Sequence, residues 1–251
     1  MPISEAARRN YDALFGDRVS TLARTDPELM ECFTNFAFDE TLADSDLDPP
    51  TRLIVQLAAL IACQSLAEFR VLAGAALGVG LTPAQLKEIV YQAVPYVGMA
   101  KVVDFLHVTN QLLGERGVAL PLPGQSTTTP GTRREAGLAV QKEVVGSDQV
   151  DAMHANASAD ERRFQRYLSA NCFGDYLTRS EIDLSHRELL IFAMLVALGG
   201  CDSQVRAHVT GNFNVGNNRT VLLSVLTVLV PFIGYPRTLN GLAALNEVTR
   251  S

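Results

Sequence analysis

The feature that most constrains this chain is an internal duplication with an offset of 136 residues. Residues 70–80, followed by Val-Pro-Tyr-Val-Gly at 94–98, correspond to residues 206–216, followed by Val-Pro-Phe-Ile-Gly at 230–234. Aligned without a gap over 56 positions, the two copies share nine identities, and many other pairs exchange one apolar side chain for another. We therefore expect two copies of one fold unit with the same buried face, whose differences locate the function.

The composition is that of a globular chain with an ample core. Its 251 residues are 47% hydrophobic and 19% charged, which suits one large domain or two of roughly 120 residues. A net charge of −6, an isoelectric point near 5.2 and the lack of a Lys/Arg-rich run argue against binding to nucleic acid or to an anionic membrane surface. The partner we expect is a small-molecule substrate.

Two nearly uncharged stretches, residues 189–201 and 220–236, are the longest in the chain. Both are shorter than the roughly 20 apolar residues that a membrane-spanning helix needs, so we interpret them as buried helices. The N-terminus carries charge at once and lacks the apolar core of a signal peptide. We therefore expect a cytoplasmic protein.

Cysteines and histidines show none of the spacings of disulfide or metal frameworks. The four cysteines form no C-x-x-C pair, and the four histidines have no paired ligand spacing such as H-E-x-x-H. The residues concerned are Cys32, Cys63, Cys172, Cys201, His107, His154, His186 and His208. We expect neither a disulfide framework nor a metal site.

Every element that the sequence predicts is a helix. Ser4 and Thr82 are N-cap candidates, and Pro49 and Pro83 suit the first turn of a helix because proline needs no N–H partner there. No run alternates apolar and polar residues as a sheet requires. Residues 120–132 are rich in Pro, Gly and Thr and are typical of an extended linker.

The prediction is an all-α protein of two tandem units, residues 1–125 and 126–251, with the boundary inside this linker. The N-terminal pattern of the first unit, a helix from Ser4 to Gly16, is repeated by residues 133–146.

The second copy carries a series of short motifs in a fixed order. They are Arg187-Glu188, Gly199-Gly200-Cys201-Asp202, Arg206-Ala207-His208, Gly216 and the segment 231–236. This series resembles the carboxymuconolactone decarboxylase family, relatives of the alkylhydroperoxidase partner proteins. In the first copy, residues 80–89 leading to 96–98 look like the family segment that follows the histidine.

The resemblance implies an all-α fold whose helical units associate around a symmetry axis, commonly as a ring of six. A chain with two units would then form a homotrimer. It also implies an enzyme that acts on a small carboxylated or lactone metabolite by acid–base chemistry without a cofactor.

The peroxidase branch of the family uses C-x-x-C, with a histidine four residues after the second cysteine and a glutamate about a dozen residues before the first. Here Cys201 and His208 match the first cysteine and the histidine, but Gln204 replaces the second cysteine, and Glu188 is thirteen residues before Cys201. Disulfide cycling at this motif is therefore lost. The first copy has instead Arg52, Ser65, Glu68 and Leu72 at these positions. We expect it to be the scaffold half.

The acid–base chemistry would fall to a few residues of the second copy. Histidine is suited to moving protons, so His208 is a candidate acid or base, and Glu188 could share the proton transfer. A departing carboxylate needs a cation, so Arg187 or Arg206 is a candidate to hold it through bidentate contacts.

A helix that begins near Asp202 would place three candidates along one element. Gln204 and His208 are one turn apart on the same face and are candidates for contact with the substrate. Cys201 would lie at the positive end of the helix dipole, which could lower the pKa of its thiol. Cys201 and His208 are two turns apart, so we expect no direct contact.

Alternatives remain at this point. Cys201 could instead be the single redox cysteine of a thiol-dependent peroxidase, or merely a small buried residue. The chain could also be a non-catalytic oligomeric binding protein that kept the packing and lost the chemistry. Because Arg70 and Arg206 recur in both copies, a structural role such as capping or pairing across the unit interface is the alternative to substrate binding.

Overall fold

The computed structural model describes residues 2–250, and within them every regular element is helical. The first copy contains α1 (Glu5–Phe15), α2 (Leu22–Thr25), α3 (Pro27–Asn35), the π-helical segment η1 (Phe36–Glu40), α4 (Thr41–Ala43), α5 (Pro49–Ala62), α6 (Leu66–Gly78), α7 (Pro83–Val97) and α8 (Met99–Glu115). The second contains α9 (Arg133–Val145), α10 (Ser147–Asn156), α11 (Arg162–Tyr167), the π-helical segment η2 (Leu168–Leu177), α12 (Leu184–Leu198), α13 (Asp202–Asn214), α14 (Arg219–Ile233) and α15 (Tyr235–Arg250). The all-α prediction is confirmed.

The duplication is visible in the element bounds. Helices α13, α14 and α15 each begin 136 residues after α6, α7 and α8, and each copy has a π-helical segment before its first long buried helix. Thr82 forms a capping box at α7 with Gln85, and Asn218 caps the equivalent helix α14 through Val221 N. The same helix order therefore arises from related but not identical start signals.

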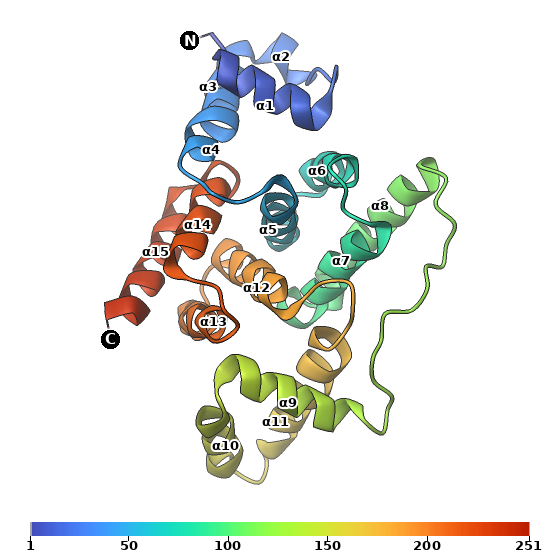
Figure 1. Cartoon of the computed structure of the whole chain (residues 1–251), viewed down its shortest axis with the longest axis vertical. Coiled ribbons are helices and arrows are strands. Elements are labelled where there is room, and N and C mark those ends of the chain that lie inside the picture. Colours follow the sequence, from blue (N-terminus) through green and yellow to red (C-terminus); the bar gives the residue numbers. More distant parts are fainter. Residues whose placement is uncertain (1, 251) are drawn as a thin grey trace.

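The two copies share one hydrophobic core. Helices α5 and α12, one from each copy, pack against each other at the centre of the molecule (Figure 1), and residues of both belong to a single buried cluster. Along α12, Leu190, Phe192 and Met194 have no exposed surface. Burying a side chain of this size contributes about 1.5–3 kcal/mol, so this contact fixes how the copies are oriented.

In the second copy, α9 and η2 are held together by a close contact between glycines. A Cβ on Gly137 of α9 would lie 2.0 Å from Ser169 O and 2.5 Å from Gly174 N of η2. Only glycine permits this approach, so α9 and η2 cross with their backbones almost touching. Helix α9 also packs on α13, and η2 packs on α7 of the first copy.

The segment between the copies, residues 116–132, contains no helix, and the predicted boundary at residues 125/126 lies within it. Figure 1 shows this segment running along the outside of the molecule from α8 to α9. Among the described residues, none of the helices combines the length and the apolar character needed to cross a membrane.

Candidate active site

A cavity of about 980 Å³ lies where the second copy meets the first. Its walls come from α9, α10, η2, α12 and α13 of the second copy and from Pro95 and Tyr96 on α7 of the first. Of the predicted site residues, Cys201, Gln204 and His208 line it together. The close crossing of α9 and η2 shapes one side of this cavity.

His208 and Glu188 form a hydrogen-bonded pair at the cavity wall. His208 Nδ1 lies 2.8 Å from Glu188 Oε2, and Glu188, on α12, has no exposed surface. An ionised Glu188 accepts from Nδ1–H, which leaves His208 Nε2 as the nitrogen available to a molecule in the cavity. The structure thus joins the two acid–base candidates, although they are 20 residues apart in the chain.

The main chain around this pair is fixed by Asn212, which is fully buried. Its Nδ2 donates to the backbone oxygens of His208, at 2.7 Å, and of Glu188, at 3.1 Å. The Asn212 oxygen in turn accepts from Asn217 Nδ2 at 2.8 Å. Asn212 therefore ties α13 to α12.

The thiol of Cys201 has a different environment from the one the sequence predicts. Helix α13 begins at Asp202, and Cys201 itself occupies the N-cap position without a side-chain cap bond. Its S–H donates to Leu195 O at 3.2 Å. Burial, together with the nearby charge of Asp202, raises the pKa of the Cys201 thiol. The sequence suggests a pKa lowered by the helix dipole, whereas burial and Asp202 raise the pKa of this thiol.

Arg187 lies outside the cavity. It is fully buried and uses every nitrogen of its guanidinium within the protein. Nη1 donates to Gln92 Oε1 at 2.7 Å, and Nη2 lies 3.0 Å from Glu88 Oε2, both on α7 of the first copy. Glu88 also pairs with Arg179 at 2.9 Å. The structure corrects the substrate-binding expectation: this arginine joins the two copies.

Arg206 also lies away from the cavity. It is half-exposed on α13 and forms an ion pair of 3.4 Å with Glu247 on α15. In its counterpart Arg70, Nη2 donates to both carboxylate oxygens of Glu115 on α8, at 2.7 and 2.6 Å. The recurring arginine thus links α6 to α8 in the first unit and α13 to α15 in the second. Its role is structural, but each pair lies within one unit and does not cross the unit interface as the alternative predicts.

Most residues that line the cavity were not among the predicted site residues, and Tyr96, Cys172 and Gln141 are examples. Tyr96, from the first copy, places its ring edge-on to His208 with centroids 5.7 Å apart. Cys172, on η2, lies 3.8 Å from the Tyr96 hydroxyl, and burial raises the pKa of its thiol to about 12. Gln141, on α9, is fully buried at the cavity wall. The alignment of Tyr96 with Phe232 marks an equivalent position, but no local pattern shows what it faces.

The first copy has a matching but chemically altered hollow of about 380 Å³. Ser65, Glu68 and Val71 line it where Cys201, Gln204 and Ala207 line the cavity of the second copy. Leu72 stands at the position of His208. The hollow of the first copy therefore corresponds in position to the cavity of the second copy but lacks an imidazole.

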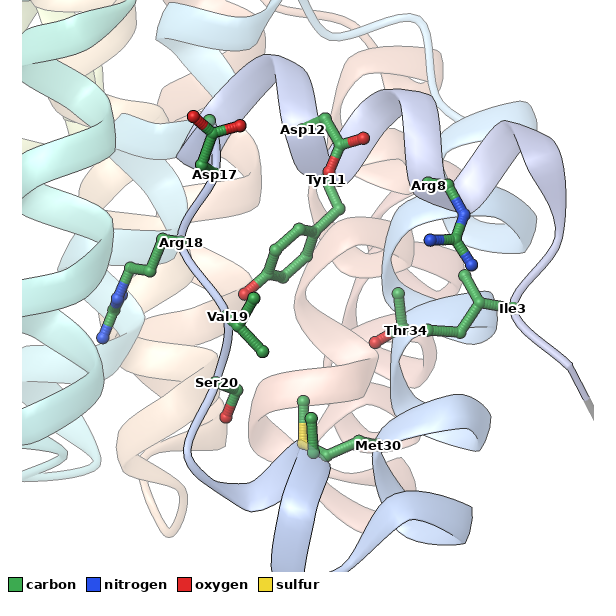
Figure 2. A pocket seen from close by; sticks show the side chains of 12 residues that line it. Ile3, Arg8, Tyr11, Asp12, Asp17, Arg18, Val19, Ser20, Met30 and Thr34 are labelled. Carbon is green, nitrogen blue, oxygen red and sulfur yellow. The ribbon is translucent and has the colours of Figure 1, made fainter.

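A third hollow, of about 560 Å³, adjoins that one between α1, the following loop and α3. Figure 2 shows Tyr11 and Met30 directed into it, with Arg8 and Asp12 along its edge. No histidine is among the described residues that line it. The candidate site is therefore the cavity of the second copy.

Within residues 2–250, no three His, Cys, Asp or Glu side chains gather closely enough to hold a metal ion. The polar groups of the cavity are instead one imidazole, two thiols, three glutamine amides, and the Tyr96 and Thr210 hydroxyls. These groups suit hydrogen bonding and proton transfer to an organic molecule.

Comparisons with known proteins agree with this architecture. The model of the carboxymuconolactone decarboxylase family matches twice, at residues 27–111 and 162–247. The 4-carboxymuconolactone decarboxylase of Acinetobacter baylyi is 28% identical over 116 residues, which are 46% of this chain and 86% of that protein. A crystal structure titled as a gamma-carboxymuconolactone decarboxylase subunit of Burkholderia xenovorans LB400 covers 97% of this chain and 96% of its own, with a TM-score of 0.56 and 18% identity. The likeness to that structure shows the shared fold.

Proposed function

The chain belongs to the carboxymuconolactone decarboxylase family, and we propose that it is a decarboxylase-like enzyme that performs acid–base chemistry on a small carboxylated or lactone metabolite. The reaction takes place in the cavity of the second copy and needs no cofactor. The observation that carries this proposal is the Glu188–His208 pair, whose free imidazole nitrogen borders a cavity large enough for such a molecule.

The pair is arranged for proton transfer. Glu188 is buried behind His208 and fixes the ring through Nδ1, so Nε2 is presented as the base that removes a substrate proton. The imidazolium that forms is stabilised by the adjacent carboxylate, as in other carboxylate–histidine pairs. When the C–C bond to the carboxyl group breaks and CO₂ leaves, the electron pair stays on the substrate carbon, and the same nitrogen returns the proton to that carbon. Glu188 holds the ring and its charge without needing contact with the substrate.

The thiol-peroxidase alternative gains no support from the cavity. The Cys201 S–H donates to a backbone oxygen, and burial raises the pKa of the Cys201 thiol, whereas a reactive cysteine needs a stabilised thiolate. Cys172, the second cavity thiol, has a pKa of about 12 because it is buried. The raised pKa values of both thiols are typical of buried packing residues and not of redox-active cysteines.

The experiment measures turnover across a panel of lactones and carboxylated lactones. Two readouts cover the reaction class: release of CO₂, and exchange of substrate protons with D₂O followed by NMR. We expect His208→Ala and Glu188→Gln to lower the rate by about 10²- to 10⁴-fold, the usual contribution of a positioned acid or base.

His107→Ala, which replaces an exposed histidine on α8, is the matched control and should keep the wild-type rate. If the wild type turns over no member of the panel, the non-catalytic binding alternative replaces this proposal. If His208→Ala keeps full activity, the assigned role of the pair is wrong.

We also propose that the chain assembles as a homotrimer. Large apolar side chains are exposed at matched positions of the two copies, with Leu29 64% and Phe164 59% exposed on α3 and α11, and Met99 50% and Tyr235 61% exposed at the starts of α8 and α15. Matched exposed apolar sites suit a ring in which each copy meets a neighbour. Light scattering after size exclusion should give three times the chain mass of 27.2 kDa. A monomer at micromolar concentration would contradict this.

A further inference from the structure

The hollow between α1 and α3 lies apart from the acid–base site and is formed mostly by residues outside the family segments. Of the twelve residues that line it, ten precede residue 27, where the first family match begins. Its volume of about 560 Å³ is in the usual range of small-molecule sites. The side chains that face this hollow therefore indicate a ligand of its own.

The clearest sign of a ligand is the hydroxyl of Thr34 on α3. Thr34 is 4% exposed and lines the hollow, and Figure 2 shows its oxygen directed into that space. Thr41 Oγ1 donates to Ala37 O at 3.2 Å, but Thr34 Oγ1 has no hydrogen-bond partner among the described residues. It is not one of the unpartnered atoms that are sealed from solvent. A molecule in the hollow can therefore reach this hydroxyl and supply the missing partner.

A second hydroxyl in the hollow belongs to Tyr11 on α1. Figure 2 shows its oxygen pointing into the hollow. Within residues 2–250 this oxygen has no hydrogen-bond partner either. Burial raises the pKa of the Tyr11 phenol, so the group is protonated at neutral pH and can donate. Two donors are thus available to acceptor atoms of a ligand.

A cation lies beside these hydroxyls. In Figure 2 the guanidinium of Arg8 turns inward from the edge of the hollow, whereas the carboxylates of Asp12 and Asp17 stay at the outer edge. The adjacent Arg9 is 3.9 Å from Glu5, but Arg8 has no carboxylate within ion-pair distance among the described residues. An unpaired guanidinium next to two hydroxyl donors matches the acceptor oxygens of a carboxylate.

The remainder of the hollow is aliphatic. Its apolar lining residues are Ile3, Val19, Ala23 and Met30. Val19 is 77% exposed, so a bound hydrocarbon chain would cover apolar surface that water now meets. The hollow shares Tyr11, Arg18, Ser20 and Met30 with the hollow of the first copy, which continues past Leu22, Leu29 and Phe33. Two hollows joined in this way suit an extended chain better than a compact ring.

We propose that the hollow between α1 and α3 binds an aliphatic carboxylate of medium chain length. Arg8 and the hydroxyls of Thr34 and Tyr11 hold the carboxylate group, and the chain lies along Met30 and continues into the hollow of the first copy. This site is separate from the acid–base pair of the second copy. It gives the N-terminal helix, which precedes the family segments, a binding function.

The first test varies the head group and the chain of the probe. Butanoate, hexanoate, octanoate and decanoate are titrated into the full chain at pH 7 by calorimetry, together with octanol and octylammonium. Affinity should rise about fourfold for each added CH₂ until the path is filled. Octanoate should bind about tenfold or more tightly than octanol and octylammonium, because only the carboxylate meets Arg8. Equal or tighter binding of octylammonium or octanol, or no binding of any carboxylate at millimolar concentration, would overturn the proposal.

Variants of the polar groups test how the carboxylate is held. Arg8→Gln should weaken octanoate binding by about 10- to 100-fold, and Thr34→Val by about tenfold, the effects of a charged and of a neutral hydrogen bond. Arg9→Gln, which changes the next arginine of α1, is the matched control and should bind as wild type. Unchanged affinity in both Arg8→Gln and Thr34→Val would contradict the assignment.

Thermal unfolding without ligand separates a binding role of Thr34 from a structural one. Thr34→Val replaces an unpartnered, nearly buried hydroxyl with a methyl group of similar size, so its Tm should equal or exceed that of the wild type. Its loss of affinity then cannot come from misfolding. A markedly lower Tm would show that the hydroxyl is needed by the fold, and the argument from Thr34 would fail.

Two further variants locate the bound chain. Met30→Trp fills the hollow between α1 and α3 and should abolish octanoate binding. Ala207→Trp narrows the cavity of the second copy from an exposed position on α13 and should leave octanoate binding unchanged. If Ala207→Trp abolishes binding and Met30→Trp does not, the carboxylate occupies the cavity of the second copy and the proposal is wrong.

Discussion

Gly211 and Glu188 are in contact across two helices: a Cβ added to Gly211 would lie 2.9 Å from Glu188 Oε2. The same Cβ would lie 3.0 Å from a methyl group of Val144 on α9. Glycine at this position of α13 therefore leaves the space in which the Glu188 carboxylate meets His208. The first copy has Ala75 at this position and Arg52 in place of Glu188, so the small residue and the acid occur together.

We predict that Gly211→Ala displaces the Glu188 carboxylate and impairs His208. Turnover should fall by roughly 10- to 100-fold, because small displacements of catalytic groups have effects of this size. The free energy of unfolding should drop by about 1–3 kcal/mol from overpacking. Gly114→Ala on α8, where an added Cβ meets nothing within 4 Å, should be neutral or slightly stabilising in urea unfolding. A fully active Gly211→Ala enzyme would show that the contact has no catalytic role.

The cysteines should differ sharply in reactivity. Cys32 is exposed, whereas burial raises the pKa of the Cys201 thiol and raises that of Cys172 to about 12. A raised pKa means less thiolate at neutral pH. Iodoacetamide at pH 7, followed by mass spectrometry of peptides, should label Cys32 first and leave Cys172 and Cys201 largely unmodified. Rapid labelling of Cys201 at pH 6 would revive the peroxidase alternative.

Arg187 should matter for stability and not for substrate affinity. Arg187→Met keeps the bulk but leaves the buried Glu88 with only Arg179 as a charged partner. Breaking a buried pair in this way costs about 3–5 kcal/mol, which urea denaturation would detect. Adding Glu88→Gln to Arg187→Met should recover part of that loss. The KM of the folded variant should stay near the wild-type value. A large rise in KM with unchanged stability would instead indicate that Arg187 binds the substrate.

Asp183 should stabilise the start of α12 in a pH-dependent way. Burial acts to raise the pKa of Asp183, but hydrogen bonds from the His186 backbone, Ser185 and the His186 ring outweigh it and lower the pKa to about 2. A depressed carboxyl pKa stabilises the fold above its unfolded value near 4, and this stabilisation is lost as the pH falls toward 2.

Because Asp183 is exposed, we expect Asp183→Ala at pH 7 to lower the free energy of unfolding by about 1 kcal/mol, the usual cost of losing an N-cap. Thermal unfolding at pH 7 and at pH 2 should show the difference between wild type and variant shrinking at the lower pH. Asp104→Ala, at an exposed position of α8, is the control. A difference that is the same at both pH values would contradict the assignment.

The sequence by itself determined the helical architecture. Caps and breakers such as Ser4, Thr82 and Gly98 act within one helical turn, so their effect can be predicted without the rest of the chain. The duplication likewise predicted matched helices, and the bounds of α6 to α8 and α13 to α15 agree with its offset of 136 residues. The motif series also pointed to His208 and Glu188, since the order and spacing of motifs are properties of the chain alone.

Tertiary packing decided which side chains meet in the cavity. Arg187 and Glu188 are adjacent in sequence, yet one turns to Glu88 of the first copy and the other to His208, because neighbouring residues on a helix point about 100° apart. Tyr96 and Gln141 reach the cavity from helices outside the motif. Burial also reversed the expected pKa direction of Cys201. These outcomes depend on contacts between distant segments, and on the desolvation those contacts cause, which local spacing does not encode.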